Sequence, residues 1–172
     1  MDTFTQQIAQ WQWFFGTVAA SAATLTGLLF VSLSVNRSPA EPLKGARLTR
    51  ARRSFGDFLF VLMMGLVFLV PHQVSGGLAL ALFVLGGARA AGIIREAVRR
   101  REAEAKRLTM SEALREYGLP ALATLGLLVI AVEILRGATI AIFGMVLVVA
   151  ALLVTASWNA WLLLVTDEVE GQ

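Results

Sequence analysis

The chain of 172 residues contains no cysteine and a single histidine, His72. Without cysteine it forms no disulfide, thiolate metal site or cysteine nucleophile, and one histidine cannot build a histidine-rich metal centre. No serine stands in a nucleophile motif with a histidine, and no paired carboxylates interrupt an apolar run. These absences argue against an enzyme, and they predict a protein that holds no metal or other cofactor.

Charge is also scarce, because 16 % of the residues are charged and 57 % are hydrophobic. Soluble domains carry about a quarter charged residues. Here the charges fall into a few blocks between long apolar runs, and the mean hydropathy is +0.71. The composition therefore predicts an all-α integral membrane protein, a helix bundle in which residues 1–172 form one membrane domain within the lipid bilayer.

Five apolar runs predict about five transmembrane helices, since a bilayer core of about 30 Å needs roughly 20 helical residues. The predicted spans are residues 11–35, 55–74, 78–94, 119–135 and 138–162.

Charged and capping residues mark the ends of these spans. Ser54 and Asp57 match a capping box at the start of the second span, and Thr109 with Glu112 match another. The third span is expected to continue as a charged, cytoplasmic helical segment, residues 95–117. A short helix opened by Thr109 should then end at Gly118, before the fourth span.

The positive charges predict how the chain is oriented. Apart from Arg89 and Arg136, every lysine and arginine lies within residues 36–54 or 95–117. Such residues collect in cytoplasmic loops, so we expect the N-terminus outside and the C-terminus in the cytoplasm of a bacterial inner membrane. Attraction to anionic lipid explains the net charge of +3 without a nucleic acid partner.

Asp57 and Arg89 are a candidate intramembrane charge pair. With the turn between the second and third spans centred near Gln73, each lies 16 residues from that centre and both share one depth. A charge at membrane depth is costly and often functional. In the alternative interpretation, Asp57 caps its helix and pairs with Arg53, while Arg89 extends to the membrane surface.

Small and hydroxyl-bearing residues give the first span a candidate helix-packing or pore face. Small residues let another helix approach closely, within one chain or between the subunits of a homo-oligomer. In a ring of subunits, the hydroxyls would instead line a polar pore. The face comprises Gly16, Thr17, Ala20, Ser21, Ala23, Thr24 and Gly27. Elsewhere, Glu133 and Arg136 predict an i,i+3 ion pair at a helix end.

Several short motifs in the first 75 residues also resemble known families. W-x-W-F-F from Trp11, A-x-L-T-G-L-L-F-V-S-L-S-V-N ending at Asn36, Arg50-Ala51 and F-L-V-P-H-Q from Phe68 occur in that order. Together they resemble small bacterial multi-pass membrane proteins, some of them labelled modulator of FtsH protease. The resemblance implies a regulatory membrane partner and no catalytic residue.

A second motif, R-x-x-F-x-D at Arg52, Phe55 and Asp57, is similar to the R…F-S-D opening of potassium channels of the transmembrane-175 type. Gly56 stands where that motif has serine. The sequence thus predicts a non-enzymatic structural or regulatory partner of other membrane proteins. The alternative is a homo-oligomeric ion channel lined by the first transmembrane helix.

Overall fold

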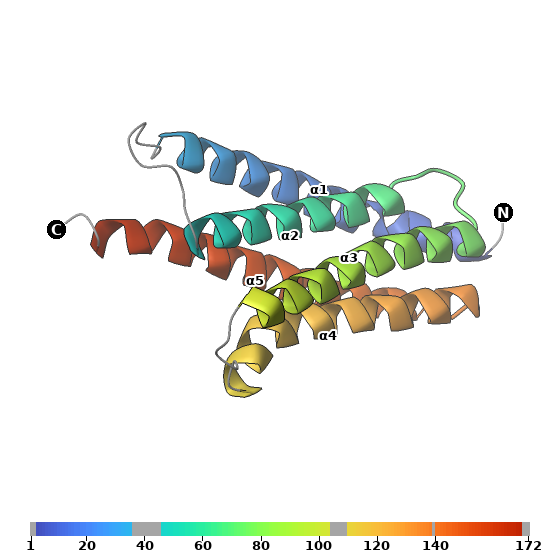
Figure 1. Cartoon of the computed structure of the whole chain (residues 1–172). Coiled ribbons are helices and arrows are strands. Elements are labelled where there is room, and N and C mark those ends of the chain that lie inside the picture. Colours follow the sequence, from blue (N-terminus) through green and yellow to red (C-terminus); the bar gives the residue numbers. More distant parts are fainter. Residues whose placement is uncertain (1–2, 36–45, 104–109, 139, 170–172) are drawn as a thin grey trace. The chain divides into compact units, whose positions relative to one another are not determined.

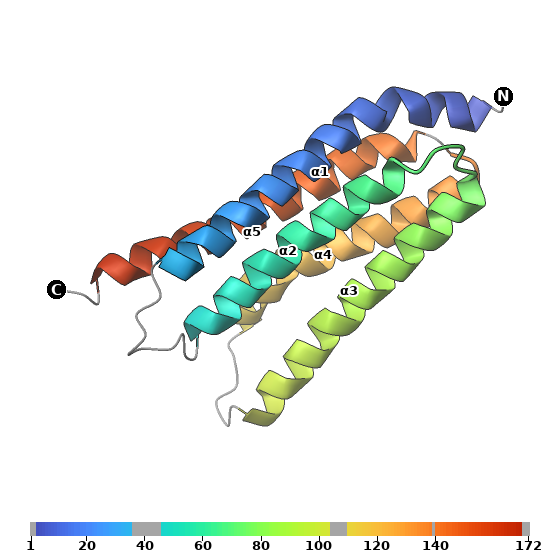
Figure 2. The same ribbon diagram turned by 90° about the horizontal axis from the view of Figure 1, so that it is seen from above.

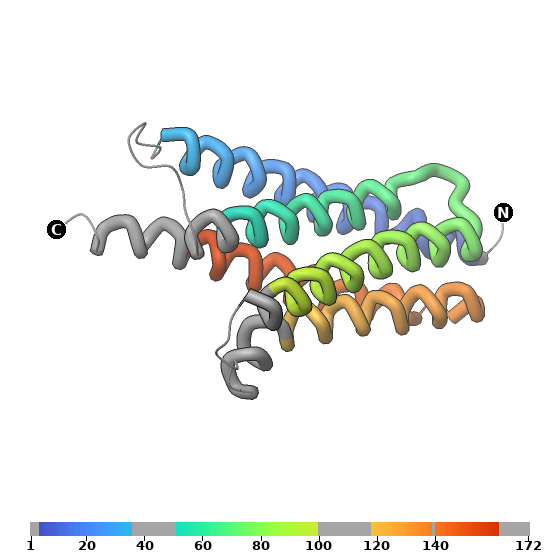
Figure 3. Tube along the Cα trace, in the orientation of Figure 1, coloured from blue at the N-terminus to red at the C-terminus, as the bar shows by residue number. Residues whose placement is uncertain are grey.

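The computed structural model describes residues 3–35, 46–103, 110–138 and 140–169. Within these ranges the chain forms five α-helices and no strand (Figures 1 and 3). The helices are α1 (Thr3–Val35), α2 (Ala46–Phe68), α3 (Ser75–Ala103), α4 (Met110–Leu135) and α5 (Ala141–Val169). The predicted all-α class is confirmed.

Four of the five helices are long and apolar enough to cross a membrane, as expected of a membrane protein. The qualifying segments are Phe4–Val35, Ser75–Arg99, Gly118–Leu135 and Ala141–Trp161. α2 is not among them. Its first half carries Arg52, Arg53 and Asp57, which leave a charge-free stretch only from residue 58 to its end at Phe68.

The start of α2 differs from the sequence prediction. The helix begins at Ala46, because residues 46–53 are mostly alanine, leucine and arginine, which favour a helix. Ser54 and Asp57 therefore lie inside α2, and the prediction that they cap its N-terminus is wrong. The predicted second span, 55–74, is also too long at its other end, since α2 stops at Phe68.

The third and fourth helices show one confirmed prediction and one error. α3 continues through the charged residues to Ala103, as expected. The predicted break at Gly118 is wrong, because α4 runs from Met110 through Pro120. Proline there removes one N–H from the helix ladder, which a long helix tolerates. Thr109, from the second predicted capping box, lies outside the described residues.

The chain forms two compact units, and the first comprises Met1–Gln10 and Val70–Ala151. In this unit α3 packs along α4 (Figures 1 and 2). Gly86 permits the contact, since a Cβ atom there would lie 2.7 Å from Leu128 Cδ2. The first part of α5 packs on α4 in a similar way, with Gly144 facing Ile130.

The second unit comprises Trp11–Leu69 and Leu152–Gln172. Here α1 lies against α2, and the ring of Phe15 stacks on that of Phe68 with centroids 3.8 Å apart and planes 9° apart. A Cβ atom on Gly65 would lie 2.8 Å from Ala19 Cβ and 2.9 Å from the carbonyl oxygen of Phe15. A core of Leu29, Ala51, Phe58 and Ala156 adds the second part of α5.

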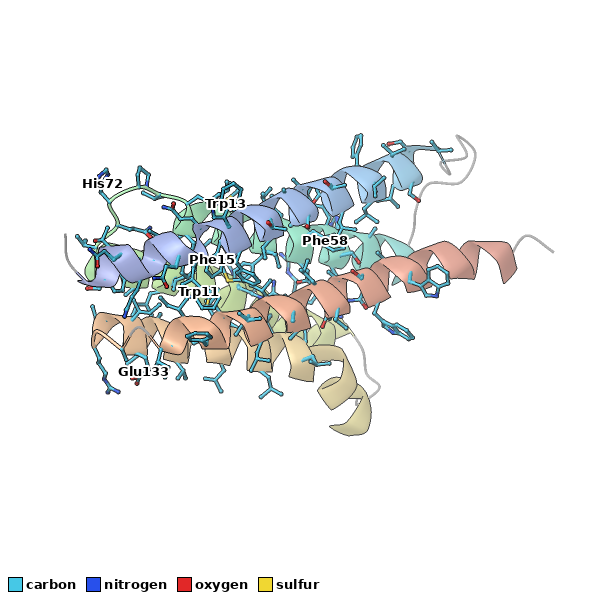
Figure 4. The ribbon with its side chains drawn as sticks, turned by 180° about the vertical axis from the view of Figure 1, so that it is seen from behind. Trp11, Trp13, Phe15, Phe58, His72 and Glu133 are labelled. Atoms are coloured by element: carbon cyan, nitrogen blue, oxygen red, sulfur yellow. The ribbon has the colours of Figure 1, made fainter. Side chains whose placement is uncertain are left out.

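Two tight turns in the first unit use left-handed backbone conformations. Gly137, at the end of α4, has a φ of 84°, and its N–H donates to the carbonyl of Ile134. Glycine adopts this conformation without steric cost, which explains its place at a helix C-terminus. His72 has a φ of 54° in the loop between α2 and α3, where its side chain is exposed (Figure 4).

Candidate functional site

The first helix has one packed face and one open face. Its packed face carries Phe15, Val18, Ala19, Ala22 and Leu29, all buried. Six residues of the predicted face are exposed instead, namely Thr17, Ala20, Ser21, Ala23, Thr24 and Gly27. Gly16, the seventh, is half-buried, and a Cβ atom there would lie 3.7 Å from Leu69 Cδ2. We call the six exposed residues the open face of α1.

Two of the three hydroxyls of the open face, those of Thr17 and Thr24, are bonded to their own helix. Thr17 Oγ1 donates to the carbonyl oxygen of Trp13 at 2.8 Å, and Thr24 Oγ1 donates to that of Ala20 at 2.9 Å. Such i−4 bonds satisfy the hydroxyl proton without a partner from outside. The open face is therefore less polar than its sequence indicates.

Large apolar side chains extend the open face along α1. Leu28 and Val31 are exposed on its C-terminal side. At the N-terminal side Trp13 is 88 % exposed (labelled in Figure 4). Tryptophan is enriched where a membrane meets water, so this ring suits the boundary of a bilayer. The open face thus has the composition of a surface that contacts lipid or another apolar helix.

Two polar residues lie on the buried face of α2. Asp57 is 7 % exposed and Ser54 is completely buried, next to the apolar residues Ala51 and Phe58. Within the described part of the chain, Ser54 Oγ forms no hydrogen bond. Burying a carboxylate and a hydroxyl costs free energy, so their presence in an otherwise apolar face needs a structural or functional reason.

The structure places the two members of the predicted charge pair on different units, Asp57 in the second and Arg89 in the first. Arg89 is half-buried in α3. Along its own helix, Asp57 lies roughly 17 Å before the end of α2, and Arg89 lies roughly 21 Å after the start of α3. Of the alternative interpretation, only the capping role of Asp57 is wrong. The pairing of Asp57 with Arg89 or with Arg53 stays a prediction.

The predicted ion pair between Glu133 and Arg136 is confirmed. Arg136 Nη1 donates to Glu133 Oε1 at 2.8 Å, three residues apart, at the end of α4 (Glu133 is labelled in Figure 4). The side chains are 69 % and 38 % exposed respectively. An exposed pair of this kind contributes less than about 1 kcal/mol, and its position gives it a local, helix-ending role.

Sequence reasoning missed the packed face of α1. Its small residues are Ala19 and Ala22, but small residues occur all around this helix, so their spacing favours no single face. Only the pairing with Gly65 on α2 distinguishes Ala19 from its neighbours.

Within the described ranges, no three histidine, cysteine, aspartate or glutamate side chains come together to hold a metal ion. Comparisons with protein-family models, with curated proteins and with solved structures found no match. The features of this chain that bear on its function are therefore the two faces of α1 and the charges of α2 and α3.

Proposed function

We propose that this chain is a non-enzymatic protein of the bacterial inner membrane, acting as a structural or regulatory partner of other membrane proteins. A transmembrane helix of the partner would dock on the open face of α1. The observation that carries this proposal is that the face combines small residues with two threonines whose hydroxyls are already bonded to their own helix.

The small residues make close contact between helices favourable. Ala20, Ala23 and Gly27 leave the backbone of α1 accessible, and a Cβ atom on Gly27 would meet nothing within 4 Å. Association inside a bilayer depends on such close packing, because lipid tails are as apolar as the helices themselves. A partner helix can therefore gain contacts along α1 that lipid chains do not supply.

A pair of leucine substitutions tests the docking face. Ala23→Leu and Gly27→Leu should release the partner from affinity-purified protein, because each adds a bulky side chain at the contact. Ala150→Leu on α5 is the control, since Ala150 is also exposed but lies on another helix. FtsH is the first partner to examine, because of the family resemblance. Equal retention of co-purified proteins by all three variants would contradict the proposal.

The channel remains the second candidate, on the observation that Thr17, Ser21 and Thr24 are exposed along one helix. A pore requires these groups to face water in a ring of subunits. We expect purified protein in liposomes to pass no K⁺, Na⁺, H⁺ or Cl⁻. A flux that Ser21→Leu abolishes while the oligomer stays intact would favour the channel instead.

The proposed topology has five crossings, with the N-terminus outside and the C-terminus in the cytoplasm. Because the chain lacks cysteine, single cysteines report on it directly. Val74, 65 % exposed in the loop between α2 and α3, should react with a membrane-impermeant thiol reagent on intact cells once it is replaced by cysteine. Ser111→Cys should react only after lysis. The opposite labelling pattern would reverse the topology.

A further inference from the structure

One line of exposed residues on α3 joins an apolar surface to two arginines. Val84, Ala88, Gly92, Arg95 and Arg99 are all exposed. They follow one another at intervals of four, four, three and four residues, which places them on one side of a helix with 3.6 residues per turn. We call this line the α3 strip. All of it belongs to the first unit.

The two arginines at the end of the α3 strip lie one turn apart. Like charges at this spacing repel each other by a few tenths of a kcal/mol in an isolated helix. An anion between them would remove that repulsion and accept hydrogen bonds from both guanidinium groups. Phosphate suits them best, because its oxygens match the fork of donors that arginine presents. Glu96, the neighbouring acid, is half-buried and lies about 100° around the helix from Arg95 and about 60° from Arg99.

The apolar part of the α3 strip has the length of one leaflet. From Arg95 back to Val84 the helix rises by roughly 16 Å. Half of a hydrocarbon core of about 30 Å is nearly the same length. At Gly92 a Cβ atom would meet nothing within 4 Å, so the surface next to the arginines is open. A ligand with a phosphate at one end and an acyl chain as long as a leaflet fits both parts.

We propose that the α3 strip binds an acidic phospholipid. Its phosphate lies between Arg95 and Arg99, and one acyl chain lies over Gly92 and Ala88 towards Val84. This site requires α3 to cross the bilayer, as its segment Ser75–Arg99 is able to do. It does not require a protein partner on α1.

Lipid binding can be measured by native mass spectrometry of the purified full chain, titrated with phosphatidylglycerol or phosphatidylcholine. The double variant Arg95→Gln/Arg99→Gln should weaken phosphatidylglycerol binding about tenfold, roughly 1.4 kcal/mol. The control Arg52→Gln/Arg136→Gln removes the same charge from two other exposed positions and should change binding less than twofold. If both double variants lose phosphatidylglycerol binding equally, the lipid is held by general attraction to positive charge, and the proposed site is overturned.

A second variant separates the lipid from a free anion. Gly92→Leu should weaken phosphatidylglycerol binding while both arginines remain, because the leucine occupies the path of the acyl chain. Water-soluble glycerophosphate, which has no acyl chain, should compete poorly with the lipid in either protein. The proposal fails if Gly92→Leu leaves phosphatidylglycerol binding unchanged or if glycerophosphate competes fully with the lipid. Either result would mean that the α3 strip binds the anionic group alone, without the acyl chain. Ala23→Leu should leave lipid binding unchanged, so loss of the partner on α1 is recognised separately.

Discussion

Each unit contains a glycine at which two of its own helices pack closely, and the two glycines meet different neighbours. In the second unit, Gly65 of α2 faces the backbone of α1, with the Phe15 carbonyl oxygen and Ala19 Cα both within 3.2 Å of a Cβ atom placed there. In the first unit, Gly86 of α3 faces the side chain of Leu128 on α4. The first contact joins backbone to backbone, and the second joins backbone to a flexible side chain.

This difference decides what each contact can accommodate. A leucine side chain moves by changing its rotamer, whereas a carbonyl in a helix moves only with the helix. Overpacking a close contact costs about 1–3 kcal/mol, and most where the neighbour cannot shift. The contact between α1 and α2 should therefore be the less tolerant of the two. It also fixes the rotation of α1, and with it the direction of the open face.

Gly65→Ala should have the largest effect of the substitutions considered. The added methyl group meets backbone atoms, so we expect a loss of about 3 kcal/mol in stability and displacement of α1 from α2. The thermal unfolding midpoint in detergent measures the loss. A double variant, Gly65→Ala with Ala19→Gly, should recover only part of it, because the Phe15 carbonyl remains in place. A midpoint equal to that of the unchanged chain would contradict the backbone contact.

The predicted charge pair also has one member in each unit. Asp57 belongs to the second unit, with Gly65, and Arg89 belongs to the first unit, with Gly86. If the two charges are partners, Asp57→Asn or Arg89→Gln alone should each cost about 1–2 kcal/mol, and the double variant should cost less than their sum. Thermal unfolding of all four proteins gives the coupling. The exposed pair of Glu133 and Arg136 is the control and should couple by less than about 1 kcal/mol. Strictly additive effects would show that Asp57 and Arg89 are not partners.

Gly86→Ala should have a smaller effect than Gly65→Ala. The added methyl group displaces the side chain of Leu128, which costs little because that side chain can change its rotamer. Alanine favours a helix over glycine by up to about 1 kcal/mol, so this gain nearly cancels the cost. Shortening the neighbour tests the reason directly. In a Leu128→Ala background, Gly86→Ala should become stabilising, measured by the same unfolding midpoint. A loss as large as that of Gly65→Ala would mean that the two contacts are alike.

The smallest effect should come from Gly27→Ala on the open face. No atom lies within 4 Å of the added methyl group, so the unfolding midpoint of the isolated chain should stay the same or rise slightly. A marked loss of stability in the purified chain would place Gly27 in a contact and contradict the openness of this face.

Much of the fold follows from local features of the sequence. The long apolar runs predict about five transmembrane helices, and four of the five described helices are long and apolar enough to cross a membrane. The spacing of Glu133 and Arg136 predicts their ion pair, which is confirmed. Local signals fail where two influences compete. Ser54 and Asp57 match a helix N-cap, but the helix-forming residues before them extend α2 in the N-terminal direction to Ala46.

The packing of the helices is harder to predict, because it depends on residues distant in sequence. Nothing in α1 alone shows that Gly65 will lie against Ala19 and leave Ala20 and Ala23 open. The same limit applies to Asp57 and Arg89. Equal distance from a turn predicts a similar depth for two residues, but it does not predict the rotation of each helix that would bring their side chains together.

The short charge-free stretch of α2 has a consequence for the thickness of the membrane around this protein. Residues 58–68 rise by roughly 16 Å, whereas Ser75–Arg99 of α3 rises by roughly 37 Å. A tilt lets α3 match a bilayer thinner than its own length. If α2 crosses the bilayer as proposed, the lipid beside it must thin or the headgroups must reach inward to Arg52 and Arg53. Lengthening the acyl chains of the host lipid should therefore strain α2 first, and membranes of different thickness should not accept this protein equally.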